Sequence, residues 1–395
     1  MFNSFVIASE EQVQLIESLN LTELFCDITR CKVPPLPKRV VVPPPDHDKE
    51  EAKARLAALA ARQMAEKQAR TEVMNELRGR LDKAQKHYSG AAKAVGSAIS
   101  RFSVNPKESV RQVAQVSSDS TDALLADPDS AIVLIAEKGH QEGNAAHSLS
   151  VMTLSLLLGK QARLPAEALR ALGISALLHD IGKSAISPAI LHATQRNKHE
   201  ENIYRTHCRI GQDEALRAGT LTAPMLDAIL HHHEKLDGSG FPDGLSGDAI
   251  HLAARIVAIA NRFDNLANPY DTRLALSPSE ALSKMWTREQ KLFDPLLLQL
   301  FVRAMGVYPP GSIVQLEDGR IGAVVSSASI ENPLSPQVMI YEPEVPRRQA
   351  IIIDLAREGA CRIQRPLRLQ ERPPAELDYL LPRRRISWFP TEGKA

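Results

Sequence analysis

The side chains best suited to chemistry in this 395-residue chain are histidines and one neighbouring carboxylate in its central part. The set comprises His147, His179, Asp180, Lys183, His207, His232 and His233. Imidazole and carboxylate are ligands that suit Fe, Mn and Zn, and one carboxylate can bridge two ions. A lone histidine on a helix is more often structural, so the interpretation depends on the whole set. Together these residues indicate a metal centre.

Helices are the elements that must position these residues. The candidates fall within or at the ends of apolar patterns of helical period, about 20 to 30 residues apart. Antiparallel helices with this spacing can each point one ligand into a common core. We therefore expect residues 101–306 to form a mainly α domain. The clearest helical patterns are Ser148–Leu158, Ala166–Leu178, Ala223–His231, Leu252–Leu266 and Pro278–Trp286.

The pair His179-Asp180 ends an apolar helix and is followed by a glycine and by Lys183. A buried carboxylate beside a buried imidazole needs a charge partner, which a metal ion supplies. The run from His231 to His233 cannot converge completely on one ion, because successive helical residues are rotated by about 100°. We expect at most two of the three to bind metal and His231 to be structural.

Four blocks of this sequence resemble the HD-GYP family of bacterial phosphodiesterases. Members of that family open cyclic di-GMP to the linear dinucleotide and often continue to GMP. The resemblance covers about residues 125 to 306 and implies an HD-type helical bundle with that activity. The blocks are His147-Ser148, His179-Asp180-Ile181-Gly182-Lys183, His207-Cys208-Arg209-Ile210-Gly211 and the run from His232 to Pro242; the match continues through Arg255-Ile256 and Phe293-Asp294-Pro295.

The resemblance also implies a site with two divalent ions, Fe or Mn. In that site Asp180 would bridge both ions, and Lys183 would lie against the scissile phosphate. Two cations lower the pKa of a bound water and neutralise the charge that grows on the phosphate. One ion would be held by His147 and His179, and the other by His207, His232 and His233.

The sequence departs from the family pattern at three places. Asn261 stands where the family has an aspartate ligand, and a neutral amide oxygen is the weaker donor, although Asp264 one turn later could compensate. Phe241 replaces the signature tyrosine, so a phenol is lost. Of a basic stretch that contacts substrate phosphate, only Arg273 keeps its charge. Gly143 lacks the glutamate that some members use for a third metal.

These departures leave three functional hypotheses open. The leading one is an active cyclic di-GMP phosphodiesterase in which Lys183, Arg273 and Phe241 contact the substrate. The second is a weakened module that binds cyclic di-GMP or a signalling partner such as a diguanylate cyclase. The third is an HD hydrolase for another phosphate ester, against which the paired histidines and the Gly-Phe-Pro loop argue.

The overall composition restricts the classes of binding partner and the cellular compartment that we expect. Lys and Arg number 48 against 47 acidic residues, so a basic stripe for nucleic acid is not expected. The four cysteines form no close pairs and are expected to be free thiols in a reducing compartment. No apolar run approaches the roughly 20 residues of a membrane span, and no signal peptide is evident. We therefore expect a cytoplasmic protein.

The remaining segments divide as follows. Residues 1–45 are interpreted as a small α/β remnant with a proline-rich linker, in which Ser9 caps a helix that begins at Glu10. Residues 46–100 form a connector helix of strong helix formers. Its stripe of Met74, Leu77, Leu81, Ala84 and Tyr88 would either pack on the next domain or form a homodimer.

Residues 307–395 are interpreted as a small β-rich extension with a polar, basic tail. Its clearest element is a hairpin with a turn at Asp318-Gly319.

Overall fold

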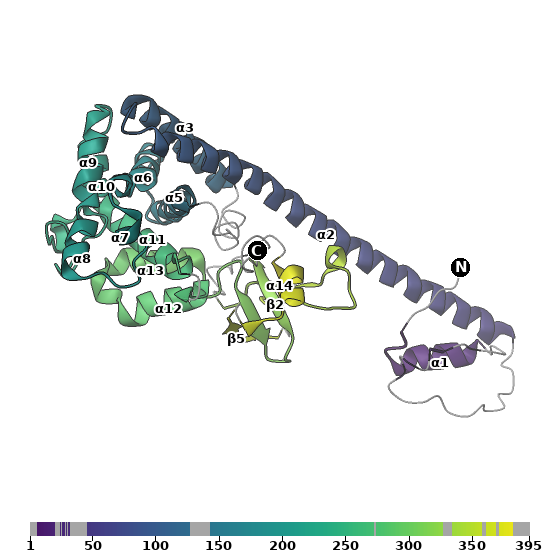
Figure 1. Ribbon diagram of the computed structural model, residues 1–395. Helices are drawn as coiled ribbons and strands as arrows, with labels where there is room; N and C mark the ends of the chain where they lie inside the picture. The colour runs from purple at the N-terminus through teal and green to yellow at the C-terminus, as the bar shows by residue number, and fades with distance from the viewer. Residues whose placement is uncertain are drawn as a thin grey trace, which may run out of the picture. The chain divides into compact units, whose positions relative to one another are not determined.

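The computed structural model describes residues 6–19, 24, 26–27, 29, 31, 46–126, 143–271, 274–326, 334–357, 361–368 and 371–381. The chain divides into two units, Met1–Val73 and Met74–Ala395, which are described separately. Helix α2 (Asp46–Ser100) begins in the first and ends in the second (Figure 1).

The first unit contains helix α1 (Glu10–Ser18) and the beginning of α2. The side chain of Ser9 accepts a hydrogen bond from the Gln12 backbone, which confirms the predicted N-cap. The proline-rich linker and most of the expected extended segment before it lie outside the described residues. On α2, i,i+4 ion pairs such as Arg55–Glu51 add to the helix-forming composition.

The second unit is mainly helical, as predicted, and each of the five helical patterns corresponds to a helix. Three 3-10 turns, Ile181–Ala185, Gly247–Ala249 and Gln290–Leu292, join them. The helices are α3 (Pro106–Ala126), α5 (Gly143–Gln161), α6 (Ala166–Leu178), α7 (Pro188–Leu191), α8 (Lys198–Arg205), α9 (His207–Arg217), α10 (Ala223–His231), α11 (Leu252–Ala267), α12 (Pro278–Arg288) and α13 (Pro295–Met305).

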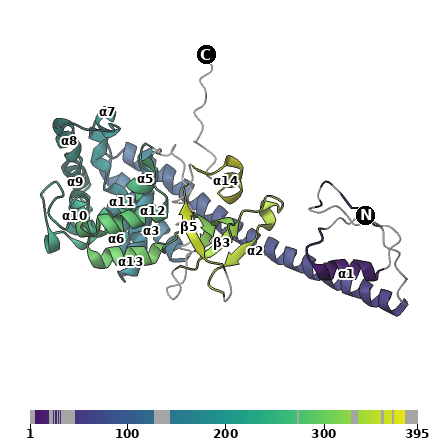
Figure 2. The same cartoon turned by 90° about the horizontal axis from the view of Figure 1, so that it is seen from below.

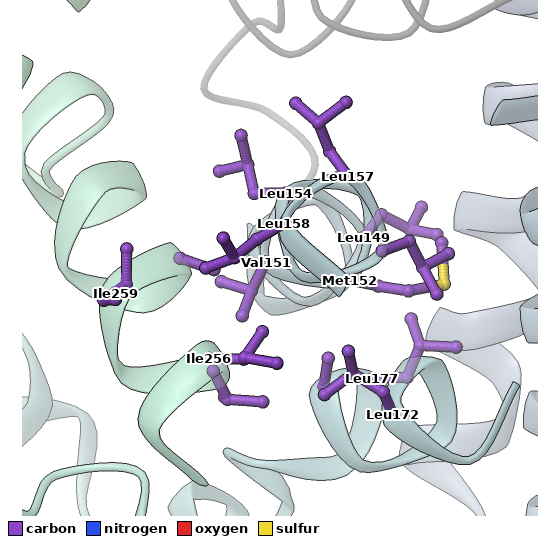
Figure 3. Packing of buried hydrophobic residues seen from close by; sticks show 14 of the residues in the cluster. Leu149, Val151, Met152, Leu154, Leu157, Leu158, Leu172, Leu177, Ile256 and Ile259 are labelled. Atoms are coloured by element: carbon purple, nitrogen blue, oxygen red, sulfur yellow. The ribbon is translucent and has the colours of Figure 1, made fainter. Parts of the chain in front are cut away.

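Helix α5 lies at the centre of this bundle. Its residues are apolar almost all round, as is usual for a helix that other helices enclose. Leu149 and Met152 pack toward α6, and Val151 packs toward Ile256 on α11 (Figure 3). The end of α2 joins the same core through Ala91, Val95 and Ala98. This core fixes the helix ends that carry the candidate residues.

The end of α2 tests part of the prediction that the apolar stripe packs on the next domain. The Tyr88 hydroxyl donates a hydrogen bond to the Ala146 carbonyl over 3.4 Å, so this last residue of the stripe contacts α5. The side chains of Met74, Leu77, Leu81 and Ala84 lie outside the described part of the chain. A dimer through the stripe therefore stays a prediction.

After the bundle comes a five-stranded antiparallel sheet in the order β4-β3-β2-β1-β5, as the β-rich pattern predicted (Figure 2). The predicted turn is present, with Gly319 at a φ of 85° between β1 and β2. The final helix, α14 (Pro374–Leu380), was not predicted, and residues 382–395 lie outside the description. The strands are β1 (Ile313–Leu316), β2 (Ile321–Ser326), β3 (Gln337–Ile340), β4 (Ile352–Asp354) and β5 (Ile363–Leu367).

None of the described helices is both long enough and apolar enough to cross a membrane.

Candidate metal centre

Helix ends bring the candidate ligands together. His147 lies in the first turns of α5, His207 begins α9, and His179 and His232 are the C-cap residues of α6 and α10. The turn after His179 lies directly against α9, and a Cβ on Gly182 would collide with the His207 backbone. A glycine at this position is therefore what lets Asp180 approach the histidine of another helix.

Asp180 lies at the centre of the site, and its two oxygens face different histidines. Oδ2 is 3.5 Å from Nε2 of His147 and 3.3 Å from Nε2 of His179. Oδ1 is 3.5 Å from Nε2 of His207 and 3.5 Å from Nε2 of His232. One carboxylate therefore stands between two pairs of imidazole nitrogens, as a bridging ligand would.

The other ring nitrogen of each of these histidines has a fixed partner. Nδ1 of His179 donates to the Ala176 carbonyl over 2.8 Å, and Nδ1 of His232 donates to the Ile229 carbonyl over 2.7 Å. His207 makes the same contact with a carbonyl one turn earlier. A proton held on Nδ1 leaves the Nε2 lone pair available to the centre of the site.

Several polar atoms in the centre are buried without a hydrogen-bond partner. Such atoms destabilise a folded protein by about 1–3 kcal/mol each unless something binds them. Lone pairs of imidazole and carboxylate that converge in this way fit a divalent cation. The atoms are Nε2 of His147, His179, His232 and His233, and Oδ1 of Asp180.

Protonation states also suit a cation. Burial lowers the pKa of His207 to about 3 and that of His232 to about 4, so both rings are neutral near pH 7. Burial disfavours the charged form of Asp180, yet His179 and Lys183 hold its pKa well below the ordinary value. Neutral imidazoles around an ionised carboxylate are the forms that bind metal.

Two groups of ligand atoms are compact enough to hold an ion, within 4.8 Å of one another in each group. The first cluster consists of His147, His179 and Asp180. The second cluster consists of His207, Cys208, His232 and His233, and Asp180 Oδ1 faces it. The six histidine and aspartate candidates are thus brought together. Cys208 was not predicted as a member.

Lys183 lies beside this centre, as the motif led us to expect. Its Nζ is 2.5 Å from Asp180 Oδ2. Burial alone would lower the pKa of Lys183, but the charge of Asp180 and the contact with Tyr204 raise it above its ordinary value. The ammonium group is therefore charged, and it lies where it can neutralise a phosphate oxygen.

Tyr204 is a residue of the site that the sequence analysis missed. Its ring centroid is 5.6 Å from Lys183 Nζ and 4.9 Å from the His207 ring. The Arg196 guanidinium lies 3.9 Å from the same ring centroid. The sequence signal was available, because Tyr204 precedes His207 by three residues, or about one helical turn. The site therefore contains a phenol, although the signature tyrosine is replaced.

Phe241, the replacement for that tyrosine, packs against the second cluster. Its ring is stacked on His233 with centroids 4.5 Å apart. Glu234 fixes the loop, since its Oε1 accepts backbone hydrogen bonds from Asp243 over 2.7 Å and Gly244 over 3.0 Å. This loop anchor was also missed, although Glu234 directly follows the paired histidines.

Asp264 is placed differently from the expectation that it could compensate as a ligand. Its Oδ2 is 2.7 Å from Nδ1 of His147, which is the ring nitrogen that points away from Asp180. Asp264 therefore supports His147 from behind, in the carboxylate–histidine arrangement common at metal sites. Asn261 and Asp264 lie about one turn apart on α11, so helical spacing alone made either a candidate ligand. Only the structure shows which nitrogen of the His147 ring the Asp264 carboxylate contacts.

Asn261 is buried on α11, and its Oδ1 accepts a hydrogen bond of 2.6 Å from Asn265 Nδ2. The amide oxygen already has a hydrogen-bond partner, and a metal-binding role for Asn261 stays a prediction. His231 is turned to carboxylates, with Asp227 and Asp243 at 2.9 and 3.0 Å from its two ring nitrogens. Arg273 lies outside the described residues.

Comparison with known proteins agrees with the motifs. Residues 129–297 match the HD domain family, and residues 1–113 match a domain family of unknown function (DUF3391). The second match extends beyond the expected N-terminal module, through the whole connector helix and into α3.

Three curated relatives are informative. The chain is 33% identical over 243 residues to the cyclic di-GMP phosphodiesterase PA4108 of Pseudomonas aeruginosa, covering 60% of this chain and 58% of that protein. It is 35% identical to the cyclic di-GMP phosphodiesterase response regulator RpfG of Xanthomonas campestris, covering 42% and 44%. It is 34% identical to 3'3'-cGAMP-specific phosphodiesterase 1 of Vibrio cholerae, covering 35% and 32%.

The chain thus matches between about a third and three-fifths of the length of these relatives. The residues that match the HD domain family include the His-Asp pair and the paired histidines. Residues 129–297 therefore resemble the HD domains of phosphodiesterases that act on cyclic dinucleotides.

Proposed function

We propose that the chain is a metal-dependent phosphodiesterase that cleaves cyclic di-GMP through a site with two divalent ions. The observation that carries the proposal is the position of Asp180, whose two oxygens face two separate sets of buried imidazole nitrogens. A single-ion site would need only one such set. The names of the relatives supply the substrate class.

The ligand roles follow from the two clusters. His147 and His179 would hold one ion, and His207, His232 and His233 would hold the other, with Asp180 shared between them. Bound divalent ions supply Lewis-acid chemistry at a phosphodiester. Fe or Mn suits a set of nitrogen and carboxylate donors.

The remaining residues bind and orient the substrate. The Lys183 ammonium would contact a non-bridging oxygen of the scissile phosphate and stabilise the charge that develops there. The Phe241 ring, stacked on His233, would provide an apolar wall for a guanine base. Arg273, the cation kept from the family's basic stretch, would meet the second phosphate of the dinucleotide.

Turnover and metal content test the proposal together. The full-length chain is purified anaerobically without chelator, loaded with Fe(II) or Mn(II), and assayed with cyclic di-GMP and with 3'3'-cGAMP. We expect hydrolysis of cyclic di-GMP, and a loss of at least about 10³-fold in Asp180→Asn, because both ions lose their shared ligand.

His231→Gln is the matched control, since it changes a neighbouring histidine that faces other carboxylates. It should keep its metal content. If the loaded wild-type protein leaves both cyclic dinucleotides intact, the enzymatic proposal is wrong.

A second function is favoured by specific observations, namely a binding module with weak turnover. Asn261 offers a neutral oxygen that Asn265 already occupies, and Phe241 offers no phenol. Tight binding of cyclic di-GMP by the metal-loaded protein, without hydrolysis, would establish this alternative.

A further inference from the structure

Cys208 is a buried thiol inside the second cluster. It follows His207 on α9 and is completely inaccessible to solvent, whereas Cys26 and Cys31 are exposed and Cys361 is half-buried. Nothing in the ligand set implied by the resemblance requires a sulfur here. The question is whether this thiol only fills space or belongs to the metal centre.

The distance between Cys208 Sγ and the nearest histidine nitrogen is compatible with coordination of one metal ion by both atoms. Cys208 Sγ is 3.6 Å from Nε2 of His207. Nitrogen and sulfur ligands of one ion, at roughly 2.0–2.1 and 2.3 Å from it, lie about 3–3.6 Å apart for ligand–metal–ligand angles of about 90–110°. The observed distance suits a hydrogen bond in the metal-free protein, and it is also one that two ligands of a single ion can adopt.

The surrounding atoms complete such a set. Ligand atoms of His207, Cys208, His232 and His233 all lie within 4.8 Å of one another. Nε2 of His232, whose side chain is fully buried, and Nε2 of His233 have no hydrogen-bond partner. These two nitrogens are an observation independent of the cysteine, and they show that the second cluster contains buried lone pairs that a cation could bind.

We propose that Cys208 Sγ is a ligand of the ion held by His207, His232 and His233. This inference rests on the metal centre of the proposed function and extends it. On binding, the S–H bond breaks, the sulfur binds the cation, and the proton leaves to solvent. A sulfur donor favours Fe(II), Co(II) or Zn(II) over Mn(II), so the two clusters would differ in metal preference.

Cobalt(II) alone is the probe, because a thiolate bound to cobalt adds a charge-transfer absorption in the near ultraviolet to the visible ligand-field bands. We expect this absorption in the cobalt-loaded full-length chain and its complete loss in Cys208→Ser. The triple variant Cys26→Ser, Cys31→Ser, Cys361→Ser should retain it, which excludes the other thiols as its source.

The outcomes separate this inference from the proposed function. Cobalt bound with ligand-field bands but without the thiolate absorption, already in the wild-type protein, refutes sulfur ligation and leaves the metal centre intact. A wild-type protein that binds no cobalt at this site overturns both. The wild-type spectrum decides these points even if Cys208→Ser fails to fold.

Discussion

The two clusters around Asp180 are supported by different kinds of contact. His179 in the first cluster and His207 and His232 in the second each contact a backbone carbonyl three residues earlier in the chain. In the first cluster, His147 depends on the Asp264 carboxylate from another helix, 117 residues away in sequence. Local support is fixed once the helix forms, whereas distant support requires the whole bundle. His147 is therefore the ligand most easily altered by substitution of a distant residue, and it belongs to the first cluster.

Acid should act most strongly on the second cluster, and this is the largest effect we expect. Because the pKa values of His207 and His232 are depressed, the unfolded chain binds more protons as pH falls below about 6.5. The metal-free protein should lose up to about 1.4 kcal/mol of stability per pH unit for each histidine, until the pH nears 4. Urea unfolding at several pH values measures this slope.

His232→Gln should reduce that slope, because it removes one of the imidazole rings that burial holds neutral. A free energy of unfolding that stays constant between pH 6.5 and 4.5 would show that these histidines are not held neutral.

Removal of the negative charge of Asp264 should lower the metal affinity of the first cluster and leave that of the second cluster unchanged. Asp264→Asn keeps the shape but gives His147 a neutral partner, and such changes typically cost about 10- to 100-fold in metal affinity. Titration with Mn(II) should then show one weakened site and one unchanged site. Asn268→Ala is the control, since Asn268 contacts the other oxygen of Asp264. Equal weakening of both sites would contradict the division into two clusters.

Tyr204→Phe should separate substrate contact from metal binding. The variant keeps the ring that Arg196 and Lys183 approach but loses the hydroxyl. We expect about a 10-fold fall in kcat, equivalent to the loss of one hydrogen bond of about 1.4 kcal/mol, with metal content unchanged. Tyr379→Phe, which removes a buried hydroxyl near the C-terminal sheet, should have no effect. A loss of metal in Tyr204→Phe would assign the tyrosine a structural role.

Asn261→Asp should strengthen the first cluster by several-fold, the smallest effect in the series. An aspartate can still accept the hydrogen bond from Asn265, and it adds the negative charge that a cation favours. Isothermal titration of the metal-free protein measures the gain. Asn265→Asp places the same charge one turn away on the exposed surface. If both variants gain equally, Asn261 does not lie at a metal.

Much of this organisation could be predicted from the sequence, because helical periodicity and the order of the motifs constrain it. The five helical patterns became α5, α6, α10, α11 and α12, and the Asp318-Gly319 turn joins β1 to β2. The His-Asp pair and the paired histidines already indicated which helix ends would meet.

Side-chain direction could not be predicted in the same way. Asp264 faces Nδ1 of His147, and Tyr204 lies beside Lys183, because of how α11 and α8 are rotated in the bundle. The helical period shows that these residues share a face with a ligand, but it does not show which atom they reach. Cys208 escaped notice for a related reason, since adjacent residues on a helix normally diverge.

The central claim is that Asp180 bridges two ions, and anomalous diffraction from crystals of the metal-loaded protein tests it most directly. The account predicts two anomalous peaks per chain, about 3.5–4 Å apart, one beside His147 and His179 and the other beside His207, His232 and His233, with one oxygen of Asp180 on each. A single peak, or two peaks of which only one contacts Asp180, would contradict it.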